Sequence, residues 1–278
     1  MASLRGLRTI ASGLDHPEGV ATGPDGLLYA GGEAGQVYRI DPAAGSCEEI
    51  ANTGGFVLGL CLDAAGAIYA CDMGRPAVVR IDPDDGSVET YCDSAGGAAL
   101  VCPNWPAFAP DGSLVVSDSG TESATSKDGR VACVPPGGGE AKVISDGPLH
   151  FPNGLAVSSE GDVVVLESFT PRLSALRDGQ AELIAELPDV VPDGVAIDAE
   201  GGYVVSCYYP FRLYRVPPGS ATAELLLDDP LGIHLPMPTN VAFFGPGLRS
   251  LAIAQLAGWS IVAIELPFAG APLNYPAL

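Results

Sequence analysis

Basic residues are scarce in this sequence. Its 278 residues include 13 lysines and arginines against 34 aspartates and glutamates, which gives a formal net charge of −21. Nucleic-acid phosphates and anionic lipid headgroups are attracted by positive fields, and a protein this acidic repels both. The composition therefore argues against a nucleic-acid or membrane partner, and we expect a small-molecule substrate instead.

Long apolar runs are also missing. No stretch approaches the roughly 20 consecutive apolar residues of a membrane span. The N-terminal MASLRGLRTIASG has no continuous apolar region of the kind found in secretory signals. We therefore expect a cytoplasmic protein. The seven cysteines are an odd number and are widely spaced, so we expect them to be reduced and mostly buried.

Several familiar catalytic motifs are absent. The sequence contains no Cys-x-x-Cys pair and no His-Glu-x-x-His, so neither a thiolate zinc site nor a zincin is predicted. It contains no Gly-x-Ser-x-Gly elbow and no local cysteine–histidine signature. Covalent catalysis by a serine or cysteine therefore has no support in the sequence.

What the sequence does contain is a repeat that reads as strand, tight turn, strand. Five copies align one glycine in the turn, where a hairpin needs a residue that accepts positive φ. These copies are GVATGPDGLLYA (19–30), GLCLDAAGAIYA (59–70), WPAFAPDGSLVV (105–116), GLAVSSEGDVVV (154–165) and GVAIDAEGGYVV (194–205). NVAFFGPGLRSLAIA (240–254) is a looser sixth copy, and a further strand follows most of them.

The spacing of the repeat predicts the fold. Successive copies start 40 to 49 residues apart, which is the length of a four-stranded propeller blade, and helical periodicity is nearly absent. We predict an all-β, six-bladed β-propeller of four-stranded antiparallel blades that fills residues 1–278 as one domain. Residues 7–11 are expected to supply the outer strand that closes the last blade. The polar insertion at 119–130 is expected to be a surface loop or lid.

One column of the repeat is mostly polar. The residue directly before the inner strand of each blade is Glu18, Leu58, Asn104, Asn153, Asp193 or Thr239. Inner strands line the central channel of a propeller, so equivalent positions converge on its axis. Carboxylate and amide oxygens suit Ca²⁺, with Mg²⁺, Mn²⁺ and Zn²⁺ as alternatives. Taken singly, each residue also fits a plain turn former.

At these positions the chain resembles the gluconolactonase, senescence-marker-protein and luciferin-regenerating-enzyme family. The resemblance lies in HPEGVATGPDG (16–26), FPNGLAVSSEGDVVVLES (151–168) and VPDGVAIDAEGGYVVSCY (191–208). It implies a six-bladed propeller with one catalytic divalent metal on its axis. Carried over by position, it implies that Glu18, Asn153 and Asp193 ligate the metal. FVLGLCLDAAGAIYACD (56–72) is similar to the strictosidine-synthase-like proteins.

The third blade departs from the family pattern. The resemblance implies that Asn104 is a further metal ligand or an amide that faces the substrate. Sugar-lactone members of the family carry an arginine two residues before this asparagine and an aspartate directly after it. This chain has Cys102 and Trp105 there. The substrate therefore loses two polar contacts, and we expect it to be less polar than a sugar lactone.

The reaction that these residues favour is hydrolysis of a cyclic ester by water activated on the metal. Asp193 is the predicted base, with Glu18 in reserve. Around the mouth of the channel we expect Phe56, Trp105, Phe169, Tyr208 and Tyr209 to line an apolar pocket, although each also fits a packing role. His150 is a further substrate-side candidate, or a plain loop histidine.

Two other classes of function stay open at this point. The same metal site would serve phosphotriester hydrolysis, an isomerisation or an aldol-type step, because a fold does not determine a reaction. A non-enzymatic propeller that binds a ligand would need the polar column only as structure. The sequence does not indicate an oligomeric state.

Overall fold

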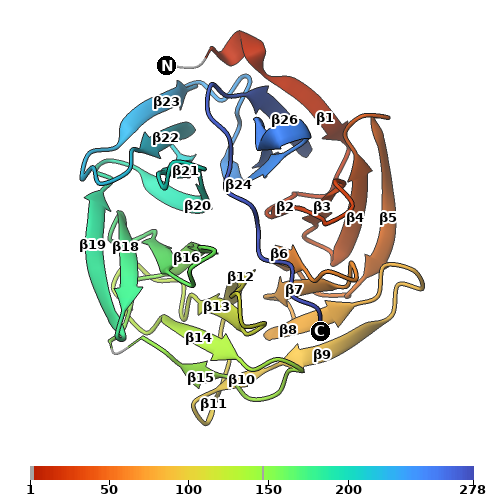
Figure 1. Cartoon of the computed structure of the whole chain (residues 1–278), viewed down its shortest axis with the longest axis vertical. Coiled ribbons are helices and arrows are strands. Elements are labelled where there is room, and N and C mark those ends of the chain that lie inside the picture. The colour runs from red at the N-terminus through yellow and green to blue at the C-terminus, as the bar shows by residue number, and fades with distance from the viewer. Residues whose placement is uncertain (1–2, 146) are drawn as a thin grey trace.

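The computed structural model describes residues 3–145 and 147–278 and shows six antiparallel sheets arranged around a central axis (Figure 1). Each sheet has four strands, and successive sheets follow one another along the chain. In the described residues the helical segments are two short 3-10 turns, η1 (Leu4–Gly6) and η2 (Pro246–Leu248). The predicted all-β, six-bladed propeller is therefore confirmed.

The first five blades each contain four consecutive strands from the axis outward. The first blade contains β2 (Val20–Thr22), β3 (Leu28–Gly31), β4 (Gln36–Asp41) and β5 (Ser46–Asn52), and the second contains β6 (Val57–Leu62), β7 (Ile68–Asp72), β8 (Ala77–Ile81) and β9 (Val88–Cys92). The third blade contains β12 (Pro103–Phe108), β13 (Leu114–Asp118), β14 (Arg130–Val134) and β15 (Lys142–Val143), and the fourth contains β16 (Pro152–Val157), β17 (Val163–Glu167), β18 (Arg172–Arg177) and β19 (Gln180–Glu186). The fifth blade contains β20 (Val191–Ile197), β21 (Tyr203–Tyr209), β22 (Arg212–Val216) and β23 (Glu224–Asp228). A two-stranded hairpin, β10 (Ser94–Ala95) and β11 (Ala98–Ala99), lies between the second and third blades.

The sixth blade is closed by the N-terminus. It contains β24 (Pro238–Phe244), β25 (Ser250–Gln255) and β26 (Ser260–Glu265), and its outermost strand is β1 (Arg8–Ser12), which pairs antiparallel with β26. Strands from the two ends of the chain thus complete one sheet, as the sequence predicts for residues 7–11. This closure joins the last blade to the first and leaves the ring without a gap.

The hydrophobic core is divided into six layers, one between each pair of neighbouring blades. Tyr69 and Phe108, for example, contact each other edge to face at 4.9 Å between the second and third blades. Val20 and Ala252 belong to the layer that joins the first and sixth blades. Each sheet buries both faces against its neighbours, so the stability of the ring comes from these contacts between blades.

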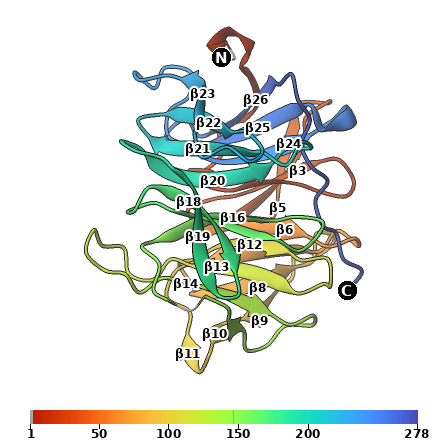
Figure 2. The ribbon, with the colours of Figure 1, turned by 60° about the vertical axis from the view of Figure 1, so that its left-hand side comes forward.

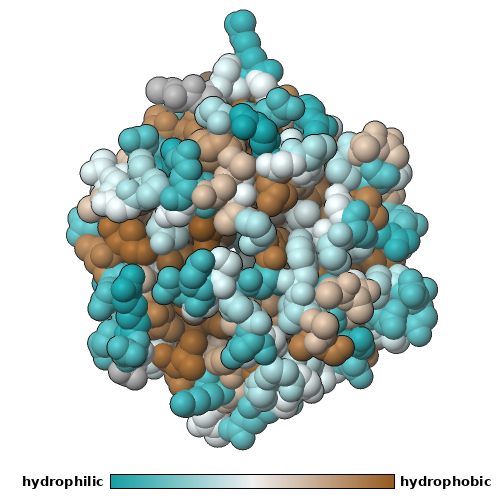
Figure 3. Space-filling view, in the orientation of Figure 1, coloured by the Kyte–Doolittle hydropathy of each residue, from teal (hydrophilic) through white to brown (hydrophobic). Residues whose placement is uncertain are grey.

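The two ends of the channel differ. The inner strands begin at one end, which we call the ring face, and finish at the other, which we call the tail face. After β26 the C-terminal segment crosses the centre of the tail face (Figures 1 and 2). There Ala271 donates its backbone N–H to Ile197 in the fifth blade, and Ala64 in the second blade donates to Pro276. The tail face carries a mixture of hydrophilic and hydrophobic residues (Figure 3).

The insertion predicted at 119–130 is the connection between β13 and β14 on the ring face. Half of its residues are exposed. Asp128 holds the loop together by accepting hydrogen bonds from the backbone and hydroxyl of Thr121 and from the hydroxyl of Ser126. In the part of the chain that the structure describes, no helix is long and apolar enough to cross a membrane.

Candidate metal and substrate site

The six residues of the predicted column form a closed ring around the axis, here called the axial ring. Its members are Glu18, Leu58, Asn104, Asn153, Asp193 and Thr239. Each is adjacent to the next blade through backbone contacts. The hydroxyl of Thr239 donates to the carbonyl of Glu18 at 2.7 Å, and the hydroxyl of Ser117 donates to the carbonyl of Asn153 at 2.7 Å. Residues spread over the whole chain thus meet at one end of the channel.

A β-bulge lies at the axial-ring residue in five of the six blades. The pairing of β16 with β17 shifts between Pro152 and Leu155, and the pairing of β20 with β21 shifts between Pro192 and Val195. The same shift occurs at the start of the inner strand in the second, third and sixth blades. A bulge inserts an unpaired residue and re-aims its side chain. The bulge therefore explains why these side chains depart from the alternation of the strand.

Glycine follows the axial-ring residue in four blades because neighbouring inner strands approach closely there. A Cβ added to Gly154 would collide with the carbonyl oxygen of Asp193 and would lie 2.8 Å from Cα of Gly194. Both obstacles are backbone atoms, which cannot rotate away. The absence of a side chain at Gly154 thus allows the fourth and fifth blades to bring Asn153 and Asp193 together.

We expect Gly154→Ala to lower the free energy of unfolding by about 1–3 kcal/mol, because the new methyl group overpacks the contact between two blades. Urea denaturation would measure the change. Gly147→Ala is the matched control, because an added Cβ there meets no heavy atom within 4 Å in the described part of the chain. Equal stability of the two variants would contradict the proposed role of the close approach.

Three oxygen acceptors near the axis are buried without a hydrogen-bond partner among the described residues: Oδ1 of Asn153, Oδ1 of Asp193 and Oδ1 of Asn240. The amide of Asn153 is oriented, because its Nδ2 donates to Ser168 at 3.2 Å while Ser168 donates to the carbonyl of Pro192 at 2.7 Å. Leaving a buried acceptor unpaired costs about 1–3 kcal/mol. A cation or a ligand donor near the axis is the kind of partner that such acceptors need.

The two carboxylates of the axial ring destabilise each other's charge. Burial raises the pKa of Asp193 to about 7. Burial, followed by the charges of Asp193 and Glu33, raises the pKa of Glu18 well above its ordinary value. Two buried carboxylates without a counter-charge resist ionisation, and a divalent cation between them would reverse that effect.

The other axial-ring positions have different roles. Leu58 is a buried apolar residue, and the hydroxyl of Thr239 is engaged with the backbone of Glu18. Asn104 is buried at the bulge of β12, where its carbonyl oxygen lies against Gly59. The axial-ring residues whose side chains carry an oxygen not engaged with the backbone of the next blade are Glu18, Asn104, Asn153 and Asp193, and they remain the candidate donors.

Asn240 is a site candidate that the sequence analysis missed. It is buried and follows Thr239, in the column where four other blades have glycine. Its Cα would lie 2.7 Å from a Cβ added to Gly194, directly after Asp193. The signal was present in the sequence as a polar side chain in a glycine column, but a strand reading without the bulge does not direct that side chain to the axis.

The predicted aromatic residues divide between the two sides of the axial ring. Tyr208 lies near the ring-face end of β21, and burial, followed by the charges of Glu18 and Asp193, raises its pKa. Phe56 and Phe169 are half-buried on ring-face loops, and Tyr209 is exposed there. Trp105 is buried and packs over Gly59, where it lines the channel below the ring.

His150 is buried and holds the insertion loop. Its Nδ1 lies 3.0 Å from the hydroxyl of Thr170 and its Nε2 lies 3.3 Å from the carbonyl of Ser123. Its ring packs against Phe169 at 5.4 Å between centroids. Both nitrogens therefore have partners, and the geometry fits a residue that fixes the loop beside the mouth.

Several other carboxylates near the ring face have structural partners. Asp72 accepts hydrogen bonds from the backbone of Phe56 and Arg75, and Asp118 accepts from the backbone of Cys102 and from Arg130. They hold the loops that lead into the inner strands. Asp15, His16 and Glu33 form a separate cluster, in which Nδ1 of His16 lies 2.8 Å from Asp15 and 2.9 Å from Glu33.

Backbone strain is concentrated at the approach to the axial ring. His16, Phe151 and Met237 have φ of 42°, 58° and 51°, and each directly precedes the proline before an axial-ring residue. Bulky residues at positive φ cost energy, and such residues cluster at functional sites where the surrounding structure holds them in place. The strain therefore coincides with the candidate site.

The comparisons with known proteins agree with this architecture. Residues 17–256 match the model of a family described as the SMP-30/gluconolactonase/LRE-like region. No curated protein matches the chain closely enough to count as a relative.

Similar solved structures include a gluconolactonase from Xanthomonas campestris, with a TM-score of 0.77 and 22% identity over 94% of this chain and 89% of that one. A calcium-binding regucalcin from Agrobacterium tumefaciens str. C58 has a TM-score of 0.78 and 14% identity over 98% and 97% of the two chains. A luciferin-regenerating enzyme has a TM-score of 0.76 and 15% identity over 98% and 99%. At these identities the likeness establishes the shared fold.

Proposed function

Because this chain belongs to the SMP-30/gluconolactonase/LRE-like family, we propose that it is a divalent-metal-dependent lactonase that acts on a small molecule. The observation that carries the proposal is the set of unpaired acceptors at the axial ring, where Asn153 and Asp193 each bury an oxygen without a partner. Glu18 adds a second carboxylate whose pKa is raised by Asp193. A gluconolactonase and a calcium-binding regucalcin share the fold, which supports both the reaction and the cation.

The residues present fit a divalent cation. Glu18, Asn153 and Asp193, with Asn104 as a fourth donor, offer only hard oxygen atoms, and their two carboxylates balance a charge of two. Ca²⁺ is our first choice, with Mg²⁺, Mn²⁺ and Zn²⁺ as alternatives. When bound, such an ion supplies Lewis-acid polarisation of the lactone carbonyl and a more acidic water.

The chain's own residues supply proton transfer and positioning. A carboxylate can act as a general base when it lies beside the reacting water, and Asp193 buries one oxygen without a partner at the axial ring. We assign it the proton of the attacking water, with Glu18 in reserve. The buried amides of Asn104 and Asn240, from the third and sixth blades, would orient the ester. Ring opening gives a hydroxy acid, and the proton held by Asp193 passes to the departing alkoxide.

The surroundings of the axial ring support a substrate less polar than a sugar lactone. Several large hydrophobic side chains are exposed on the ring face, in loops or at the end of β21, namely Met73, Val101, Tyr209, Leu231, Ile233 and Trp259. Cys102 is buried, and burial raises the pKa of its thiol to about 12, so it stays uncharged. These features favour contact with an aliphatic or aromatic group on the lactone.

We expect chelation to reduce lactone hydrolysis by at least roughly 100-fold and metal add-back to restore it, because the Lewis acid acts directly on the reacting carbonyl. Elemental analysis and a panel of sugar, aliphatic and aromatic lactones, assayed before and after chelation, would measure this. Aliphatic or aromatic lactones should be preferred. One bound ion without turnover of any lactone would overturn the lactonase assignment. Turnover that chelation does not change would overturn the proposed metal dependence.

A further inference from the structure

Below the axial ring, the channel widens into a chamber of about 470 Å³ that the proposed reaction does not use. It exists because every inner strand carries a small residue three positions after its axial-ring residue. These residues are Ala21, Cys61, Ala107, Ala156, Ala196 and Ala242, and all of them line the chamber. A volume of this size is within the usual range of small-molecule sites, roughly 300–1,000 Å³.

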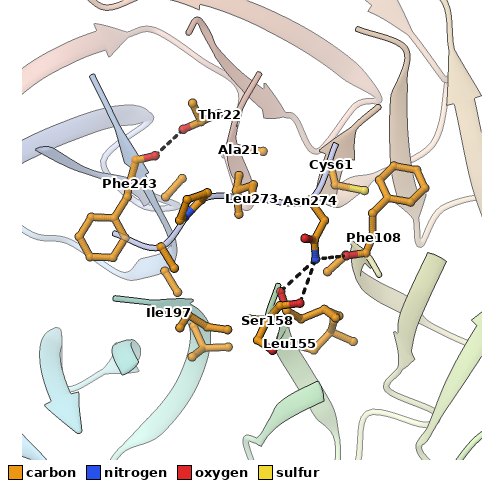
Figure 4. Close-up of a pocket in the computed structure, with 18 of the residues that line it drawn as sticks. Ala21, Thr22, Cys61, Phe108, Leu155, Ser158, Ile197, Phe243, Leu273 and Asn274 are labelled. Carbon is orange, nitrogen blue, oxygen red and sulfur yellow. Dashed lines mark hydrogen bonds between the residues drawn. The ribbon is translucent and has the colours of Figure 1, made fainter. Parts of the chain in front are cut away.

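The C-terminal segment covers the tail end of the chamber. Leu273 lies over the channel, and Asn274 reaches the opposite wall, where its Nδ2 donates to the carbonyls of Phe108 at 2.9 Å and Ser158 at 3.1 Å (Figure 4). Tyr275 donates its hydroxyl to the carbonyl of Thr22 at 2.7 Å. The segment is thus anchored to the first, third and fourth blades and forms a cover held by only a few hydrogen bonds.

The chamber has mainly apolar walls, and the side-chain oxygen of Asn274 is directed inward. Its walls come from Leu155, Ile197 and Phe243 and from equivalent aliphatic and aromatic residues of the other blades. The hydroxyl of Thr22 donates to the carbonyl of Phe243. The Nδ2 of Asn274 is engaged with the wall, and its oxygen points toward the middle of the chamber in Figure 4. A ligand here would meet apolar surface and the Oδ1 acceptor of Asn274.

The charge around the opening selects against anions. Glu160 and Asp162 are exposed at the tail end of the chamber, and the whole chain carries a formal charge of −21. A fatty acid would enter against this field. We propose that the chamber binds an uncharged, mainly apolar molecule with one hydrogen-bond donor, such as a medium-chain or aromatic alcohol, whose donor pairs with Oδ1 of Asn274.

The two tryptophans of the chain make the proposal testable. Trp105 lines the chamber and Trp259 is exposed on the ring face, so Trp259→Phe leaves a single chamber reporter. The probe is 6-bromohexan-1-ol, whose bromine quenches indole fluorescence on contact. We expect saturable quenching of Trp105 fluorescence, and we expect 1-hexanol to displace the probe and restore the fluorescence. The methyl ether of the probe, which lacks the donor, and 6-bromohexanoate, which is an anion, should each bind at least tenfold more weakly.

Filling the chamber supplies the specific control. In the Trp259→Phe background, Ala156→Leu should weaken the probe at least tenfold, whereas Ala43→Leu, an exposed position, should not. If Ala156→Leu fails to fold, Ala107→Leu from the neighbouring blade replaces it. Displacement of the probe by 1-hexanol then still tests whether binding is specific. Linear, non-saturable quenching would overturn the proposal. Saturable quenching that is unchanged in Ala156→Leu but lost in Asp193→Asn would also overturn it, because the alcohol would then bind at the axial ring and not in the chamber.

Discussion

Asp193→Asn is expected to lower kcat/KM for lactone hydrolysis by at least roughly 10³-fold. The substitution keeps the shape of the side chain and removes both the predicted proton acceptor and one of the two charges that would hold the cation. Metal stoichiometry by elemental analysis should fall below one ion per chain at metal concentrations that saturate the unsubstituted protein. The fold should be retained, because the contacts between blades do not involve this carboxylate.

Asp189→Asn is the matched control for this experiment. Asp189 is exposed in the loop that precedes the same strand, so the change in charge is identical and only the position differs. Metal binding and turnover should be unchanged in this variant. If Asp193→Asn retained full turnover with a bound ion, the base would have to be another group, and Glu18 would be examined next.

The metal-free protein is expected to lose stability as the pH rises from about 4 to about 7. The folded-state pKa of Asp193 is about 7, against an ordinary value near 3.8. The folded state therefore holds a proton that the unfolded chain has released, and this stabilisation is complete below pH 4 and lost above pH 7. At about 1.4 kcal/mol per pKa unit, the total is on the order of 4 kcal/mol. The raised pKa of Glu18 acts in the same direction.

Urea denaturation of the chelated protein between pH 5 and pH 8 would measure this effect. Asp193→Asn should flatten the profile, since the titrating group is gone and Glu18 no longer faces a second charge. Saturating Ca²⁺ should reverse the trend, because the ion binds the ionised carboxylates and stabilises the folded state more at higher pH. A pH-independent difference between the chelated protein and Asp193→Asn would show that Asp193 is not desolvated in the fold.

Much of the candidate site was predictable because its residues occupy one column of the repeat. Glu18, Asn104, Asn153 and Asp193 each directly precede an inner strand, and any propeller brings such positions to its axis. The orientation of their side chains was not predictable. It depends on the bulges at the strand starts and on Ser168, which holds the amide of Asn153. Asn240 was missed for the same reason, since in a regular strand it would face away from Thr239.

The position of Trp105 shows a second limit. The sequence places it beside Asn104 and so suggests the mouth of the channel, whereas the structure packs it over Gly59 and into the chamber below the axial ring. Adjacent residues in a strand point to opposite faces of the sheet, and the bulge at the start of β12 decides which face Trp105 occupies. A sequence pattern that does not reveal the bulge cannot tell which neighbouring blade the Trp105 side chain packs against.

The sequence by itself determined the class of fold, the number of blades, the closing strand at residues 7–11 and the membership of the axial ring. It could do so because those properties repeat at fixed spacing along the chain. Only the tertiary structure decided which oxygens are left unpaired, how strongly Asp193 and Glu18 affect each other, and that the C-terminal segment covers a chamber behind them. These depend on contacts between residues from different blades, such as Asn274 with Phe108 and Ser158, and no local pattern encodes them.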